Sequence, residues 1–342
     1  MMNRIAILLA LLPAAAVAQR PAPVKVVTSL TTYAAIAREI VGDRGEVTAI
    51  ASGSENPHYV QPRPSYVPLL AGADVFVTTG LDLELWVPAL VDKAANPKVV
   101  DGGTGYVAAW TGIPLLDIPA NVSRSQGDIH LYGNPHIWTE PLNAIQIGRN
   151  ILGVLRRVSP ANAEYFATQA KSFEDRVYKA LYGDELVGLI GGPVLADLDR
   201  QDKLFDFLRQ RQYQGAPLLN RLGGWLRRGL PFRDTQVACY HKEWDYFSRE
   251  FKVTCFDYVE PKPGIPPSPR HVQEMIQQMQ ARKIRVLLST NYYDHRQIQE
   301  LARRTGAVAV IVPSNVGGAP GVDTYFQLVD LWLNELSKAF GG

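Results

Sequence analysis

The sequence predicts an α/β fold with two lobes, each built on a parallel sheet, joined by one long helix. Short segments rich in β-branched residues alternate with helical segments in both halves of the chain, which is typical of parallel sheets covered by helices. A long helical pattern separates the two halves. The chain has 342 residues, a length that is usual for about two domains.

Residues 1–18 have the pattern of a secretory signal. Arg4 supplies the positive charge, residues 5–16 are apolar, and Ala16-Val17-Ala18 forms a small-residue cleavage site. Because no cysteine follows this site, we do not expect a lipid anchor there. No later segment reaches the roughly 18–20 apolar residues of a membrane-spanning helix. We therefore expect a protein that is secreted into the periplasm.

Residues 19–158 are expected to form the N-terminal lobe. Ligands of parallel sheets bind at the carboxyl ends of the strands, and His58 lies in the loop after the second predicted strand. The predicted strands are residues 24–28, 46–51, 74–78 and 98–101, and the predicted helices are residues 33–41, 64–71, 80–95 and 142–157.

One continuous helix within residues 159–192 is expected to bridge the lobes. Ser159 and Pro160 fit the N-cap and the first helical position, and Gly191-Gly192-Pro193 fits an end. About 30 helical residues would extend roughly 45 Å, which is longer than one small domain requires. We therefore interpret this helix as a connection that runs along both lobes.

Residues 193–342 are expected to form the C-terminal lobe. Cys239 and Cys255 lie on two successive strands and can pair in an oxidising compartment, but the sequence does not show whether their Cα atoms come close enough. The predicted strands are residues 236–240, 253–259, 284–289 and 307–312, and the predicted helices are residues 194–210, 218–228, 243–251, 269–282, 296–305 and 323–339.

Charge and cysteine spacing argue against two other kinds of site. The chain has 35 Lys and Arg against 33 Asp and Glu, a net charge of +2, and no basic run, so nucleic acid is not an expected partner. The spacing of the two cysteines fits no cysteine-based zinc motif.

Four residues are candidate metal ligands: His58, His136, His241 and Asp323. Each falls just beyond a predicted strand or at a helix start. Three imidazoles and one carboxylate would make a closed four-coordinate site, suited to Zn²⁺ and tolerable for Mn²⁺ or Fe²⁺. Because the imidazoles must be neutral, we expect metal affinity to fall as the pH drops through the histidine range. Asp323 also fits a simple N-cap of the last helix.

Other interpretations stay open at this level. Without Asp323, three histidines and a water would resemble the zinc site of a hydrolase or lyase. A receptor for a chelated metal would instead need an open cleft lined with arginines or aromatics. His130 fits either a transient fifth ligand or a solvated loop residue, and Asp82 and Glu84 fit either residues that orient an imidazole or ordinary helix-start carboxylates.

Short motifs in order along residues 24–336 carry a family resemblance. The chain resembles the metal-binding class of solute-binding proteins of ABC transporters, the periplasmic zinc and manganese receptors. The motifs are Asn56-Pro57-His58, Arg63-Pro64-Ser65, Ala73-Asp74-Val75, Gly80-Leu81-Asp82-Leu83-Glu84-Leu85-Trp86, Asn134-Pro135-His136-Ile137-Trp138, Tyr240-His241-Lys242 with Tyr246-Phe247, Glu260-Pro261-Lys262-Pro263-Gly264-Ile265 and Gly321-Val322-Asp323-Thr324-Tyr325.

The resemblance implies a monomeric receptor, not an enzyme, that holds a divalent metal between two lobes and delivers it to a permease with its own ATPase. It places the ligands at His58, His136, His241 and Asp323, and His241 in place of a glutamate favours zinc over manganese. The chain has no phosphate-binding loop, which agrees with a separate ATPase. Two features depart from the family pattern: residues 102–135 contain His130 rather than a histidine-rich loop, and residues 193–234 look longer than the usual connection.

Overall fold

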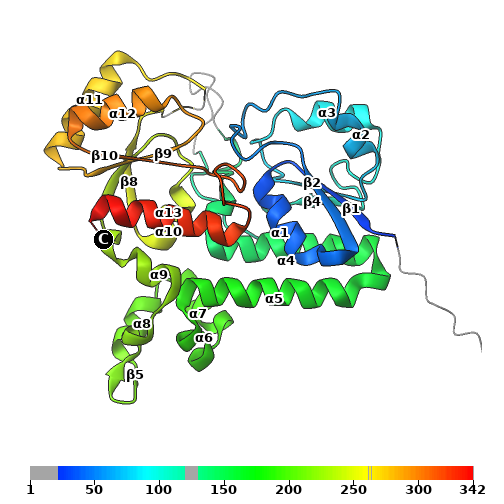
Figure 1. Cartoon of the computed structure of the whole chain (residues 1–342), viewed down its shortest axis with the longest axis horizontal. Helices are drawn as coiled ribbons and strands as arrows, with labels where there is room; N and C mark the ends of the chain where they lie inside the picture. The colour runs from blue at the N-terminus through cyan, green and yellow to red at the C-terminus, as the bar shows by residue number, and fades with distance from the viewer. Residues whose placement is uncertain (1–21, 120–129, 261, 263, 342) are drawn as a thin grey trace, which may run out of the picture.

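The computed structural model describes residues 22–119, 130–260, 262 and 264–341. Two α/β lobes stand side by side, and the long helix α5 (Ala163–Tyr182) runs below them (Figure 1). The expected signal segment, residues 1–18, lies outside the described residues. Within the described ranges, no helix is both long enough and apolar enough to cross a membrane.

The N-terminal lobe contains a parallel sheet with the strand order β2-β1-β3-β4. The strands β1 and β3 lie in the middle, and β3 is buried along its whole length because helices cover both faces of the sheet. The strands are β1 (Val24–Thr28), β2 (Gly45–Ala49), β3 (Val75–Thr78) and β4 (Tyr106–Ala108), and the helices are α1 (Thr31–Val41), α2 (Tyr66–Ala71), α3 (Val87–Ala94) and α4 (Pro141–Val158).

The fourth strand is not where the sequence pattern placed it. Residues 98–101 form a turn, because Gly102 adopts a positive φ of 75° and the backbone N–H of Gly103 donates back to the carbonyl of Val100 (2.8 Å). The strand forms only after Gly105, at β4. The predicted helix at residues 80–95 likewise begins late, at α3, because Gly80 has a φ of 80° and the chain forms a loop.

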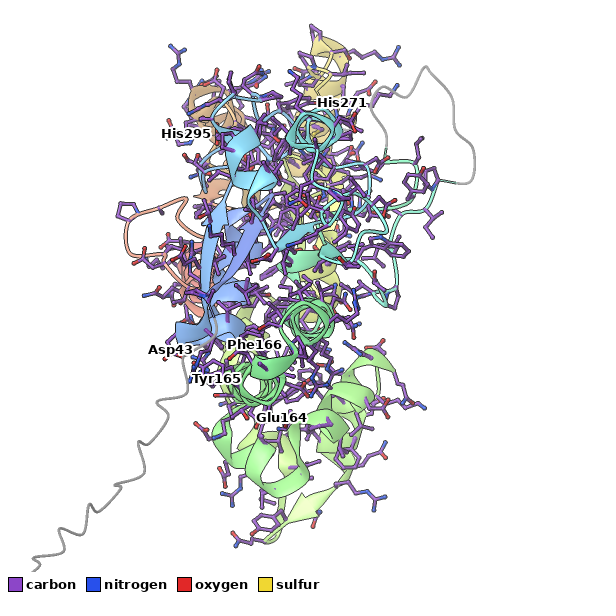
Figure 2. The ribbon with its side chains drawn as sticks, turned by 90° about the vertical axis from the view of Figure 1, so that its right-hand side faces the viewer. Asp43, Glu164, Tyr165, Phe166, His271 and His295 are labelled. Atoms are coloured by element: carbon purple, nitrogen blue, oxygen red, sulfur yellow. A yellow bond between two sulfur atoms is a disulfide. The ribbon has the colours of Figure 1, made fainter. Side chains whose placement is uncertain are left out.

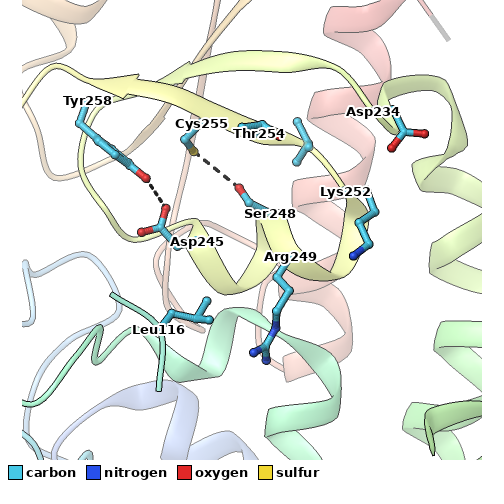
Figure 3. Close-up of a pocket in the computed structure, with 10 residues that line it drawn as sticks. Leu116, Asp234, Asp245, Ser248, Arg249, Lys252, Thr254, Cys255 and Tyr258 are labelled. Carbon is cyan, nitrogen blue, oxygen red and sulfur yellow. Dashed lines mark hydrogen bonds between the residues drawn. The ribbon is translucent and has the colours of Figure 1, made fainter. Parts of the chain in front are cut away.

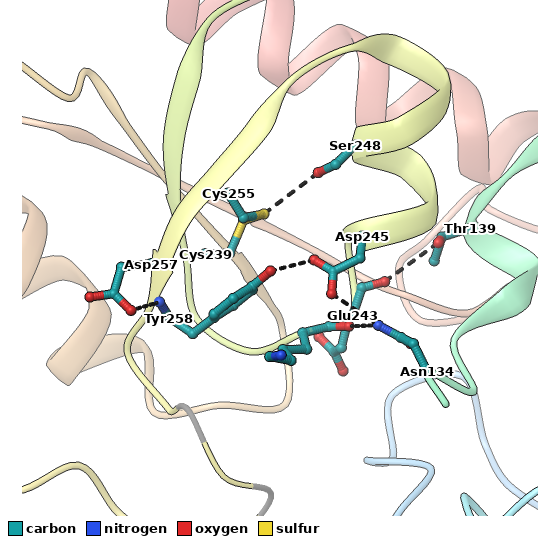
Figure 4. Close-up of a disulfide and its surroundings, with 10 residues drawn as sticks. Asn134, Thr139, Cys239, Glu243, Asp245, Ser248, Cys255, Asp257 and Tyr258 are labelled. Carbon is teal, nitrogen blue, oxygen red and sulfur yellow. Dashed lines mark hydrogen bonds between the residues drawn. A yellow bond between two sulfur atoms is a disulfide. The ribbon is translucent and has the colours of Figure 1, made fainter. Parts of the chain in front are cut away.

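The C-terminal lobe contains a second parallel sheet with the order β10-β9-β7-β8. A disulfide between Cys239 and Cys255 joins β7 to β8, with their Cα atoms 5.5 Å apart (Figure 4). The strands are β7 (Gln236–Cys239), β8 (Thr254–Tyr258), β9 (Val286–Thr290) and β10 (Val308–Val312), and the helices are α10 (Asp245–Phe251), α11 (Pro269–Ala281), α12 (His295–Thr305) and α13 (Tyr325–Phe340).

The bridging helix α5 is shorter than predicted. Gly183 ends it with a φ of 91°, and a Cβ at this position would lie 2.7 Å from the Cα of Gly223, so the chain turns where two glycines touch. The 20 residues of α5 still correspond to about 30 Å. The helix packs against α1 and α4 of the N-terminal lobe and against α9 (Gly224–Gly229) beneath the C-terminal lobe, so it connects both.

The segment after α5 forms a small projection on the side of the helix that faces away from the sheets (Figures 1 and 2). The projection contains α6 (Asp184–Ile190), α7 (Gly192–Arg200), α8 (Leu204–Gln210) and the hairpin of β5 (Gln212–Tyr213) with β6 (Ala216–Pro217). Of these, α6 falls within the range predicted for the bridging helix. The two short helices predicted for residues 193–234 are replaced by α7, α8, the hairpin and α9.

Candidate metal centre

Four histidines converge where the two lobes meet. His58, His130, His136 and His241 each contribute one ring nitrogen to a group in which all these atoms lie within 4.8 Å of one another. His58 comes from the loop after β2, and His130 and His136 come from the segment before α4. His241 follows β7 of the C-terminal lobe. The structure thus brings together the three predicted histidine ligands and adds His130.

Two of these histidines are oriented by the same short motif, Asn-Pro-His. The Oδ1 atom of Asn56 accepts hydrogen bonds from the backbone N–H (3.0 Å) and from Nδ1 (2.8 Å) of His58. Asn134 does the same for His136, at 3.0 Å and 2.9 Å. Because the backbone N–H must donate, the shared asparagine atom is the carbonyl oxygen, and Nδ1 of each ring must carry its hydrogen. The Nε2 lone pair is then free for a metal.

The other two histidines are also held through Nδ1, but by different acceptors. Nδ1 of His241 lies 3.2 Å from the backbone carbonyl of Glu260, which only accepts. Nδ1 of His130 lies 3.2 Å from Oδ1 of Asp82, whose other oxygen accepts from the backbone N–H of Leu131 (2.5 Å). Asp82 therefore orients an imidazole, as one of the two sequence interpretations proposed. Glu84 instead accepts from Ser29 and Thr79 within its own lobe.

The inward-facing nitrogens have the geometry of a cation site. Nε2 of His136 and Nε2 of His241 are buried without a hydrogen-bond partner among the described residues. Nε2 of His58 lies 3.2 Å from Nε2 of His130. When both rings carry their hydrogen on Nδ1, the lone pairs of the two Nε2 atoms face each other, an arrangement that a cation between them would stabilise. Zn–N bonds of about 2.0 Å in a tetrahedron place neighbouring nitrogens about 3.3 Å apart, close to the separation observed.

Burial favours the neutral form of His58, His136 and His241. It lowers the pKa of His58 and of His136 well below 6.5, and the neighbouring histidines lower both further. Burial also lowers the pKa of His241 to about 4. Neutral imidazoles are the form that binds a metal, so the site is ready for a cation at neutral pH.

Aromatic side chains fix the loops that carry the ligands. The indole Nε1 of Trp86 donates to the carbonyl of Pro57 (2.9 Å), and Trp138 donates to the carbonyl of Ser314 in the C-terminal lobe (2.8 Å). Trp138 is fully buried, with its ring 5.6 Å from the ring of His136. It therefore shields one side of the histidine cluster from water.

Asp323, the predicted carboxylate ligand, does not join the cluster. It is exposed and lines a surface groove with Arg38 and Glu39 of α1. The loop after β10 turns at two glycines with positive φ, Gly317 and Gly321, before it reaches Asp323.

The N-cap interpretation of Asp323 is wrong, because Thr324 caps α13 through a reciprocal pair of hydrogen bonds with Gln327.

His130 lies in the cluster, although the sequence did not predict it among the four ligands. From the sequence it fitted either a transient fifth ligand or a solvated loop residue, because a single histidine in a long loop has no periodic signal. Its spacing of six residues from His136 and the nearby Asp82 become informative only once the fold brings them together. The remaining two histidines, His271 and His295, lie on α11 and α12 at the opposite end of the lobe from α5 (Figure 2).

Comparison with known proteins gives a consistent assignment. A family model described as zinc-uptake complex component A, periplasmic, matches residues 26–180 and 217–339. The iron-binding protein YfeA of Yersinia pestis is 25% identical over 324 residues, which cover 93% of this chain and 86% of that protein. The high-affinity zinc uptake system protein ZnuA of Bacillus subtilis is 28% identical over 152 residues, 43% of this chain and 46% of that protein.

Solved structures show the same fold. A crystal structure of ZnuA covers 93% of this chain and 100% of its own, with a TM-score of 0.67 and 15% identity. The binding protein FpvC of Pseudomonas aeruginosa, solved in complex with Mn²⁺, covers 93% of this chain and 98% of its own, with a TM-score of 0.67 and 23% identity.

The family model skips residues 181–216, which form most of the projection described above. These unmatched residues overlap the segment, residues 193–234, that looked longer than the usual connection in the sequence. The matched segments contain both sheets and all four histidines. The chain belongs to the ZnuA family of metal-binding substrate-binding proteins of ABC importers, whose members are transport proteins and not enzymes.

Proposed function

We propose that this protein is a periplasmic receptor that binds one Zn²⁺ ion and delivers it to an ABC permease powered by a separate ATPase. The observation that carries this proposal is the convergence of four imidazoles, each with its Nδ1 atom held by an acceptor outside the cluster. The proposed ligands are His58, His130, His136 and His241. In this proposal the expected export signal, residues 1–18, is removed and the mature chain acts as a monomer.

The donor set favours zinc over manganese. Imidazole suits Zn²⁺ and other borderline metals, whereas Mn²⁺ prefers carboxylate, carbonyl and water oxygens. The cluster supplies nitrogen donors and, with Asp323 outside it, no carboxylate. Four protein ligands also fill a tetrahedral zinc shell, which suits holding the ion rather than activating a water molecule.

A manganese receptor is the second candidate. Relatives of this chain include a manganese ABC transporter substrate-binding lipoprotein, PsaA of Streptococcus pneumoniae, 26% identical over 159 residues. The observation that favours this candidate is structural similarity to FpvC, which was solved with Mn²⁺. The four nitrogen donors weigh against it for this chain.

A competition titration tests the proposal. Metal-stripped protein would be titrated with Zn²⁺ against a strong chelator, and with Mn²⁺ in a separate series. We expect one tightly bound Zn²⁺ per chain and much weaker Mn²⁺ binding. His136→Ala should abolish tight binding, and His295→Ala, which removes an exposed histidine on α12, should leave it unchanged. Equal or tighter Mn²⁺ binding would reassign the cargo, and absence of binding to either ion would refute a metal receptor.

A further inference from the structure

Asn134 contacts both lobes through one amide group. Its Oδ1 holds the ring and the backbone of His136, as described above. Its Nδ2 donates to the backbone carbonyl of Lys242 (2.8 Å) and to Oδ2 of Asp245 (3.0 Å), both in the C-terminal lobe (Figure 4), and makes a longer contact with Oδ2 of Asp117 (3.3 Å) in its own lobe. The side chain is only 3% exposed, so water does not replace these partners.

The C-terminal side of this contact is itself firmly held. Oδ1 of Asp245 accepts from the hydroxyl of Tyr258 on β8 (2.6 Å), beside the surface pocket that Cys255 also lines (Figure 3). The hydroxyl of Tyr246 on α10 donates to the backbone carbonyl of Asn134 (2.9 Å). Residues of the C-terminal lobe therefore fix Asn134 at both its side chain and its main chain.

We infer that Asn134 is a positioning residue that couples the orientation of His136 to the approach of the C-terminal lobe. This inference rests on the proposed metal-binding function. A primary amide is planar and rigid, so the acceptors that hold its nitrogen also determine where its oxygen points. When the lobes separate, Nδ2 loses its two shorter contacts, to Lys242 and Asp245, and keeps only the longer contact to Asp117. The amide is then held less firmly, and the ring of His136 loses its fixed orientation. The protein thus presents four aligned imidazoles only in the closed arrangement.

Asn56 provides a natural control for this inference. It makes the same two hydrogen bonds, to the backbone and to the ring of His58. Among the described residues, it makes no hydrogen bond to the C-terminal lobe, and it is half-buried rather than buried. Asn56 therefore orients a ligand without contacting the other lobe, and a comparison of the two asparagines separates orientation from coupling.

The first arm of the test is a pair of double-mutant cycles on zinc affinity. Asn134→Ala and Asn56→Ala should each weaken binding by about 10–100-fold, the usual effect of removing a residue that orients a ligand. Asp245→Ala should cost about tenfold in the wild-type and Asn56→Ala backgrounds, but less than about twofold in the Asn134→Ala background. Equal costs of Asp245→Ala in all three backgrounds would overturn the coupling.

The second arm measures ring tautomers in metal-free protein, through long-range ¹H–¹⁵N NMR spectra of the histidine side chains at a pH of about 7.5, above the histidine range. Asp245→Ala should shift His136 from one Nδ1–H tautomer toward a mixture and leave His58 unchanged. Asp245→Asn should restore the wild-type spectrum, because an amide oxygen still accepts from Asn134. An unchanged His136 tautomer in Asp245→Ala would overturn the inference.

The two arms also separate this inference from the proposed function. Absence of zinc binding in the wild-type protein would refute the receptor, and the tautomer spectra would still decide the role of Asn134. Tight zinc binding with additive mutations and an unchanged His136 tautomer would leave the receptor intact and refute the coupling. If Asn134→Ala does not fold, the Asp245→Ala and Asp245→Asn pair gives the same decision.

Discussion

The carboxylate of Asp82 accepts a hydrogen bond from Nδ1 of His130 at 3.2 Å, and both side chains are largely buried. Asp82 thereby gives a loop histidine the same outward anchor that asparagines give to His58 and His136. An anionic acceptor also increases the basicity of the imidazole and strengthens its bond to a metal. This contact explains how a histidine in a long loop is oriented to serve as the fourth proposed ligand.

Removal of the Asp82 carboxylate should therefore weaken the site. We expect Asp82→Ala to reduce zinc affinity by about 10–100-fold, as is usual for residues that orient a metal ligand. Asp82→Asn should lose less, because its carbonyl oxygen still accepts from Nδ1. Chelator competition measures both variants. Asp92→Ala, at an exposed position of α3, serves as the control, and an effect as large as that of Asp82→Ala would contradict a specific role.

His130, rather than the Asp323 that the family resemblance implies, should supply the fourth ligand. His130→Ala removes one of four donors and should weaken zinc binding by at least about 100-fold. Asp323→Ala removes an exposed carboxylate outside the cluster and should change the affinity by less than about twofold. Isothermal calorimetry on the two variants gives the comparison. A large loss in Asp323→Ala with normal binding in His130→Ala would restore the original assignment.

Zinc affinity should depend on pH with a midpoint below that of free imidazole. Protons compete with the metal only when the pH falls toward the pKa of the folded, metal-free ligands. Burial lowers the pKa of His58 and His136 well below 6.5 and that of His241 to about 4. Affinity should therefore vary little above about pH 6.5 and fall as the pH decreases toward about 4.

This result would revise the expectation from sequence alone, which placed the fall in the ordinary histidine range. Chelator competition at a series of pH values tests it, with the chelator's own protonation corrected. A half-maximal loss of affinity near pH 6.5 would contradict the buried, neutral site.

The disulfide should stabilise the C-terminal lobe. Cys239 and Cys255 are separated by 16 residues, and a closed loop of about this length contributes roughly 3 kcal/mol by restricting the unfolded chain. We expect the Cys239→Ala, Cys255→Ala double variant to lose about this free energy of unfolding in a denaturant titration. An unchanged unfolding midpoint would show that the disulfide adds nothing to the β7–β8 pairing.

Local sequence signals predicted most of the strands of the two sheets. They also singled out His58, His136 and His241, three of the four histidines that the structure brings together. The strand β1 lies where its β-branched residues placed it, and β10 and α12 begin within one residue of their predicted starts. These elements were predictable because strands covered on both faces are apolar runs, and the helices that cover them have one apolar stripe. Both patterns can be read from the sequence.

The errors arose where a glycine or a distant contact decided the outcome. Gly183 ends α5 because it touches Gly223, and no helical periodicity contains that information. The positive φ of Gly102 forms a turn there, so β4 begins later in the chain than predicted. His130 becomes a ligand candidate through Asp82, which lies 48 residues away in the sequence, and Asp323 lies outside the histidine cluster in the structure.

The most direct test of this account is X-ray absorption spectroscopy of the zinc-loaded protein. Four histidine ligands predict four Zn–N distances of about 2.0 Å, with outer-shell scattering from four imidazole rings. The same spectrum recorded on His130→Ala should show three imidazoles and one new oxygen or nitrogen donor. Three imidazoles and a carboxylate in the wild-type protein, with no change in His130→Ala, would contradict the four-histidine site.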